Sequence, residues 1–171
     1  MFKRIMQAAK DAGTLKVLCE TAEAVARAEG RDAPEAEHFV EAALKLPDGS
    51  AARVFARLGL DGSGFKTALA EQHREALRAV GIDGVVVEST LGVSPPLPPA
   101  EGLYRAAPSG QIVVQELARL RQRGVTGPLA GSHVIKVVAE MGHGTAARAL
   151  RQMGRDPQAF VAAADAEIAA A

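Results

Sequence analysis

Four histidines are the residues of this 171-residue chain that best suit metal binding or acid–base chemistry. They stand at positions 38, 73, 133 and 143, so no two are four residues apart, and the zinc-protease pattern H-E-x-x-H is absent. We therefore expect no metal and no cofactor. His38 and His133 are interpreted as side chains that hydrogen-bond locally near the start of a helix.

Residues 59–67, which read G-L-D-G-S-G-F-K-T, resemble a phosphate-binding loop. Phe65 separates the last glycine from Lys66, and the preceding segment has a helical pattern where such a loop needs a strand. Ser63 and Lys66 also match S-x-x-K, the serine-acylation motif, but its companion motifs are missing. No catalytic residue is predicted, and the chain is not expected to be an enzyme.

The composition is that of a helical, electrically neutral protein. Lysine and arginine together number 20, as do aspartate and glutamate, so a basic surface for nucleic acid or anionic membrane is not expected. No apolar run approaches the roughly 20 residues of a membrane helix. Cys19, the only cysteine, is interpreted as a small core residue. These features predict a cytoplasmic protein.

Apolar residues recur at helical spacing in several segments of the first half. Residues 15–29 form the first such run, and Asp32 is expected to cap the helix that follows. A turn at residues 47–49 precedes a third helix, and a fourth is predicted from about Ser63 to Ala79. The first half therefore reads as four helices.

The second half shows the same order of helices and turns. A helix is expected from Ser109 to about Gly124, and Ser132 is expected to cap the next one. After a turn at residues 142–144, Asp156 caps a last helix that has Pro157 at its first position, where the missing N–H costs nothing. The two halves therefore have the same predicted layout.

An ungapped offset of 95 residues aligns the two halves. Over positions 38–69 it gives nine identities, which include turn glycines, a capping aspartate and a phenylalanine. Two alanine-rich helical segments would not share these special residues in one register by chance, so we infer an internal duplication. The identical pairs are His38/His133, Gly49/Gly144, Ala51/Ala146, Ala52/Ala147, Arg53/Arg148, Gly59/Gly154, Asp61/Asp156, Phe65/Phe160 and Ala68/Ala163.

The duplication predicts an all-α fold of about eight helices in two pseudo-twofold-related four-helix repeats. One repeat alone buries too little surface to be stable, so the two should pack through their apolar faces. The first repeat is assigned to residues 1–79 with its N-terminal extension, and the second to residues 104–171. A linker rich in proline and glycine joins them over residues 80–103. Within it, residues 85–87 fit either a short strand or an extended arm.

The repeated residues carry a resemblance to a known family. Residues 36–44 read A-E-H-F-V-E-A-A-L and residues 49–61 read G-S-A-A-R-V-F-A-R-L-G-L-D. Both resemble the Clp N-terminal repeat, which reads T-E-H-L-L-L-A-L and then G-x-A-A-R-x-L-x-x-L-G. The second copy follows the same pattern from Gly131 to Gly154, and the likeness extends over residues 15–79 and 104–168.

The resemblance implies a non-catalytic protein-binding module. In Clp unfoldases this domain is a mobile appendage of the ATPase ring that receives substrates and adaptor proteins. Because no ATPase module follows, the chain resembles a stand-alone copy, with protein substrates, adaptors or a Clp ring as expected partners. The alternative is a regulatory interaction domain unconnected to Clp proteolysis. The peptide or adaptor is expected to bind near the groove between the halves, at residues Glu37, His38, Ser132, His133, Arg53 and Arg148.

The two copies differ at one residue of the resemblance. In the ClpC branch, the glutamate of each T-E-H pairs with the guanidinium of phosphoarginine, and Glu37 matches that glutamate. The second copy has Ser132, whose neutral hydroxyl cannot pair with a guanidinium as a carboxylate does. The preferred interpretation of Glu37 is a first-turn carboxylate favoured by the helix dipole, with phosphoarginine binding at this one copy as the alternative. Arg53 and Arg148 are expected to pair mainly with carboxylates within their own halves.

Overall fold

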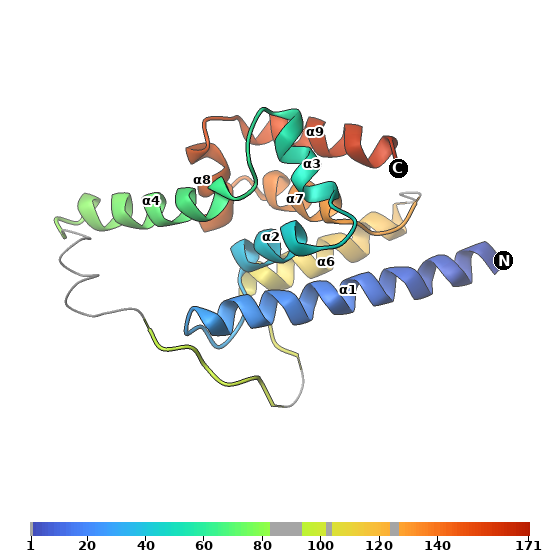
Figure 1. Cartoon of the computed structure of the whole chain (residues 1–171), viewed down its shortest axis with the longest axis horizontal. Helices are drawn as coiled ribbons and strands as arrows, with labels where there is room; N and C mark the ends of the chain where they lie inside the picture. The colour runs from blue at the N-terminus through green and yellow to red at the C-terminus, as the bar shows by residue number, and fades with distance from the viewer. Residues whose placement is uncertain (1, 83–93, 102–103, 124–126) are drawn as a thin grey trace.

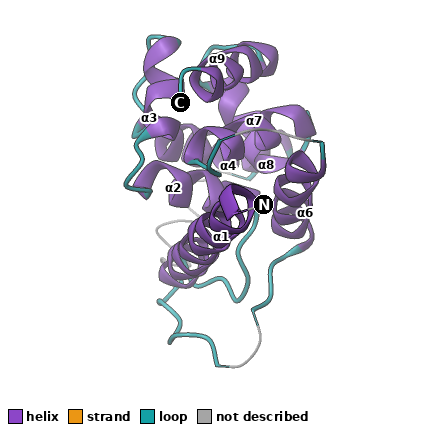
Figure 2. Ribbon diagram, turned by 90° about the vertical axis from the view of Figure 1, so that its right-hand side faces the viewer, coloured by secondary structure: helices purple, strands orange, loops and turns teal. Residues whose placement is uncertain are grey.

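The computed structural model describes residues 2–82, 94–101, 104–123 and 127–171, and this part of the chain is all-α with eight helices. Helix α1 is far longer than the rest, and Figure 1 shows it along one edge of the molecule. Figure 2 shows the helices stacked from α1 and α6 at one end to α9 at the other. The helices are α1 (Phe2–Ala28), α2 (Ala36–Lys45), α3 (Ser50–Arg57), α4 (Gly64–Ala79), α6 (Pro108–Gln122), α7 (Gly131–Met141), α8 (Gly144–Gln152) and α9 (Pro157–Ala169).

The helix boundaries repeat at the offset seen in the sequence. Helix α7 begins 95 residues after α2, and α8 and α9 follow α3 and α4 in the same order. The buried face also repeats, since Phe65 of α4 and Phe160 of α9 are both fully buried. The described part of the chain therefore contains two copies of one helical unit in a single continuous core.

The fourth helix of each repeat packs against the third helix of the other. Helix α4 contacts α8, and α9 contacts α3. The rings of Phe55 on α3 and Phe160 on α9 meet edge to face, with centroids 5.4 Å apart. Because the fourth helix of each half packs against the other half, the two halves share one core, and neither half is complete alone.

The two halves are not covered equally. Helix α9 lies across α7 of its own repeat as well as against α3. Its counterpart α4 packs against α8 and then extends outward from the body of the molecule (Figure 1). The face of α2 that corresponds to the α9-covered face of α7 is therefore covered less closely, with a pocket between it and α4.

Three local predictions from the sequence are wrong. Helix α1 begins at Phe2 rather than near Leu15. The N-cap of α2 is Glu35 rather than Asp32, because His38 supplies the local acceptor. Ser132 lies inside α7, whose N-cap is Ala130. By contrast, the predicted Asp156 cap is confirmed, since its Oδ1 accepts a 2.7 Å hydrogen bond from the backbone N–H of Gln158.

The described part of the proline-rich segment, residues 94–101, lies on the end of α1. The backbone N–H of Leu97 donates to the carbonyl of Arg27 at 2.9 Å. The Arg27 guanidinium in turn donates to the carbonyl of Pro98 at 2.6 Å. Residues 85–87, for which the sequence allows a strand or an arm, lie outside the described residues. Across the described helices, none is both long and apolar enough to cross a membrane.

Candidate functional site

A pocket of about 190 Å³ opens beside the N-terminal half of α2. Helix α2 supplies Glu37, His38 and Glu41 to its wall, and α4 supplies Lys66 and Leu69. The end of α1 closes a third side with the segment around residue 29. Three carboxylates, of residues 29, 37 and 41, thus share a small space with two cations, Arg31 and Lys66.

His38 is a buried structural residue at this pocket. Its Nδ1 accepts a 2.8 Å hydrogen bond from the backbone N–H of Glu35, as expected for a histidine at a helix start. Because Nδ1 is an acceptor, Nε2 carries the proton and donates to Glu29 Oε2 at 3.3 Å. This hydrogen bond lowers the pKa of the Glu29 carboxyl. With 2% of its surface exposed, His38 cannot meet a partner directly.

Glu37 lies in the first turn of α2 with its side chain half-buried. Burial raises the pKa of its carboxyl, and the charge of Glu35 acts in the same direction. The sequence predicts four site residues at the starts of α2 and α7, and only Glu37 among them is not fully buried. The other three are His38, Ser132 and His133. Glu37 is therefore the one placed to touch a ligand.

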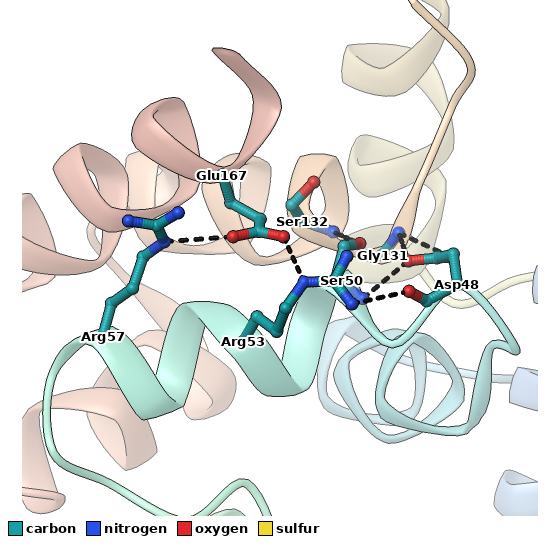
Figure 3. Close-up of polar contacts among 7 residues, drawn as sticks. All are labelled: Asp48, Ser50, Arg53, Arg57, Gly131, Ser132 and Glu167. Atoms are coloured by element: carbon teal, nitrogen blue, oxygen red, sulfur yellow. Dashed lines mark hydrogen bonds and ion pairs between the residues drawn. The ribbon is translucent and has the colours of Figure 1, made fainter. Parts of the chain in front are cut away.

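In the second repeat, the residues equivalent to Glu37 and His38 are buried. His133 and Ser132 are 3% and 1% exposed. His133 Nδ1 accepts a 3.2 Å hydrogen bond from the backbone N–H of Ala130, which matches His38 and confirms the predicted local bonding. The turn between α2 and α3 caps α7, because Ser50 Oγ accepts from the N–H of Ser132 at 2.8 Å (Figure 3).

Arg53 joins the two halves, which corrects the expectation that it pairs within its own half. Glu167 of α9 accepts hydrogen bonds from Arg53 Nε and, at 3.0 Å, from Arg57 Nε (Figure 3). The Glu167 side chain is 7% exposed. Arg53 lowers the pKa of this carboxyl, and Arg57 adds to the effect. These two ion pairs hold α9 of the second repeat against α3 of the first.

Arg148 has no such partner, although it is the repeat equivalent of Arg53. The position equivalent to Glu167 is Gln72, a neutral amide, and the position equivalent to Arg57 is Gln152. Arg148 is exposed on α8 and makes no hydrogen bond or ion pair with another described residue. The expectation that Arg148 pairs within its own half is therefore also wrong, and the cross-repeat position on α4 holds the neutral Gln72 instead of a carboxylate.

Replacing Glu167 with glutamine should lower the free energy of unfolding by about 1 kcal/mol at neutral pH. The effect is modest because Arg53 and Arg57 are 56% and 43% exposed, so water screens the pair. A carboxyl with a lowered folded-state pKa stabilises the fold above its unfolded pKa of about 4.3, and this contribution is lost as the pH falls through the folded pKa. Urea titrations of both proteins at several pH values should show the difference shrinking below about pH 4.3. A difference that grows on acidification would contradict this assignment.

Sequence reasoning missed Glu29, Glu41 and Lys66 as members of the site. They come from three different helices or helix ends, and no motif links them. A signal was present at Glu41, since the repeat places Lys136 at the equivalent position and so reverses the charge. Among the described residues, no three histidine, cysteine, aspartate or glutamate side chains are grouped in a way that would hold a metal ion.

Comparison with known proteins assigns no family to this chain. No family model matches it, and no curated protein matches it.

Proposed function

We propose that the chain is a non-catalytic protein-binding module in protein quality control or regulated proteolysis. It would act like the substrate- and adaptor-receiving domain of Clp ATPases, which its repeats resemble. The observation that carries the proposal is the unequal covering of the two repeats. Helix α9 covers α7, whereas the corresponding face of α2 opens into a pocket that a protein segment can enter.

The chemistry of the site favours binding over catalysis. His38 uses both ring nitrogens in hydrogen bonds and is 2% exposed, so it is not available as a general base. The thiol of Cys19 is half-buried, and burial raises its pKa, which disfavours the nucleophilic thiolate. The pocket combines carboxylates and apolar side chains with Arg31, Lys66 and His73, a mixture of charged and apolar groups that suits recognition of a polypeptide.

Affinity purification from cells that express the chain tests this function. We expect mass spectrometry to find Clp ATPase subunits, their adaptors or misfolded clients enriched with the wild-type protein. Recovery of one partner unconnected to proteolysis would instead favour a regulatory interaction domain. ATP hydrolysis or peptide cleavage by the purified chain would contradict both assignments.

A further inference from the structure

The second repeat shows how a helix of this fold is covered. Helix α9 lies across α7 with Ala163 and Ala164 buried. Lys136 on α7 forms an ion pair with Asp165 on α9. On the α7 side, the covering helix thus has small apolar side chains and one cross-helix ion pair, in addition to the Phe160 and Glu167 contacts that hold it on α3.

The first repeat has the same face, which α4 covers less closely than α9 covers α7. Glu41 stands at the position of Lys136, and Ala70 at the position of Asp165. Alanine offers no charge to Glu41, so the Lys136–Asp165 pair has no equivalent at these two positions, and Glu41 instead faces Lys66 near the start of α4. Leu44 on the same face is half-buried, whereas its equivalent Ala139 is 1% exposed.

The Glu41 carboxylate is buried and incompletely paired. The residue is 9% exposed, and its Oε1 has no hydrogen-bond partner among the described residues. Its Oε2 lies 3.9 Å from Lys66 Nζ, beyond hydrogen-bond distance, and the Lys66 side chain is 68% exposed. Burial of the Glu41 carboxylate carries a desolvation penalty that raises its pKa, and the Lys66 charge offsets this penalty only in part because it makes no hydrogen bond to the carboxylate. A cation brought to this position would relieve that penalty.

Two cavities meet at Glu41 and Lys66. One is the pocket of about 190 Å³ beside Glu37, and the other, of about 410 Å³, runs toward the start of α4. Apolar side chains line the two cavities on either side of Glu41, namely Leu44 and Phe65 in one and Leu69 in the other. We call this continuous surface the α2–α4 groove. It combines an apolar lining with a buried negative charge at its centre.

We propose that the α2–α4 groove binds a short amphipathic helix of a partner protein that places a lysine or arginine against Glu41 and small apolar side chains on either side. The inference rests on the proposed binding function and names the chemistry of its ligand. Charge complementarity selects a basic residue, since Glu41 Oε1 has no donor among the described residues and the four carboxylates that line the two cavities outnumber their three cations, Arg31, Lys45 and Lys66. The way α9 packs on α7 selects a helix with small side chains.

A peptide derived from α9 provides the probe. It has the 13 residues of Pro157–Ala169 with Asp165→Lys, so that a lysine faces Glu41. Fluorescence anisotropy should show saturable binding of the labelled peptide to the wild-type chain. The unchanged α9 peptide, which would place an aspartate beside Glu41, should bind at least about tenfold more weakly. Equal binding of the two peptides, or no binding of the lysine peptide, would overturn the proposal.

Variants of the chain locate the binding site. Glu41→Gln should weaken binding of the lysine peptide at least about tenfold, because a buried charge pair is lost. Glu20→Gln removes an exposed carboxylate of α1 outside the groove and should leave binding unchanged. Thermal melts followed by circular dichroism establish that both variants are folded. An unchanged affinity in folded Glu41→Gln would exclude Glu41 as the anchor.

Ala70→Lys gives a second and independent test. It places a cation on α4 where the second repeat has Asp165, so Glu41 gains an internal partner and α4 can close over α2. We expect a higher melting temperature and loss of peptide binding. Tight binding to folded Ala70→Lys would overturn the proposal, as would a dimer that forms through this groove in the wild-type chain. If affinity purification recovers the same Clp-related proteins with both variants and wild type, the groove assignment fails while the proposed function stands.

Discussion

Replacing Phe160 with alanine should lower the free energy of unfolding by about 3–5 kcal/mol, the usual cost of deleting a buried aromatic ring. The ring is fully buried and meets Phe55 of the other repeat edge to face. Its loss leaves a cavity at the point where α9 packs against α3. Urea denaturation followed by circular dichroism measures the change directly.

Ile168 on the same helix provides the control for Phe160. Its side chain is only half-buried, so Ile168→Ala removes less buried surface and should cost clearly less. A loss below about 1 kcal/mol for Phe160→Ala would mean that the exchange of fourth helices contributes little to the core.

Gly110→Ala should destabilise the fold, even though alanine is the better helix former. An added Cβ would lie 2.3 Å from the carbonyl oxygen of Pro34 and 3.0 Å from the ring of Phe39. The carbonyl belongs to the backbone, so α6 must move away from α2 to make room. Overpacking of this kind costs about 1–3 kcal/mol, which exceeds the roughly 1 kcal/mol that alanine gains over glycine in a helix.

Gly13→Ala is the matched control, because it makes the same change in another helix. Nothing lies within 4 Å of the Cβ that it would add to α1. We therefore expect this variant to be more stable than wild type by up to about 1 kcal/mol. Chemical denaturation of the pair should give shifts of opposite sign, and a stabilising Gly110→Ala would contradict the close approach of α6 to α2.

The sequence predicted the helices well because the same turn, capping and core residues occur in both repeats. The all-α class follows from helical periodicity, and the offset of 95 residues reproduces the starts of α2 and α7. The cap at Asp156 is a local feature that one turn of sequence determines. By contrast, the start of α1 was missed because residues 2–14 mix polar and apolar positions without a clear helical face.

The pairing of the helices could not be read from periodicity. A phenylalanine at helical spacing predicts a buried face, but it does not say that Phe160 packs on α3 of the other repeat. For the same reason Arg53 was assigned to its own half, while its partner Glu167 lies 114 residues away. Contacts between distant segments depend on tertiary packing, for which a single sequence carries no local signal.

The candidate site was predicted in part. The resemblance identified the residues at the starts of α2 and α7. These residues differ in their exposure, since Glu37 is half-buried and its equivalent Ser132 is 1% exposed. The groove itself depends on the divergence of α4 from α2, which no motif encodes. The reversal of charge between Glu41 and its equivalent Lys136 is the one sequence difference that could have pointed to it.

Affinity purification with the wild-type chain and with Ala70→Lys tests the central claim, that this is a protein-binding module whose first repeat is open to a partner. Quantitative mass spectrometry of both samples from the same cells gives the comparison. The account predicts that Clp ATPase subunits, adaptors or their clients are enriched with wild type and lost with the closed variant. Recovery of only an unrelated protein would contradict the binding function in proteolysis, whereas equal recovery of the Clp-related proteins with both chains would contradict the open first repeat alone.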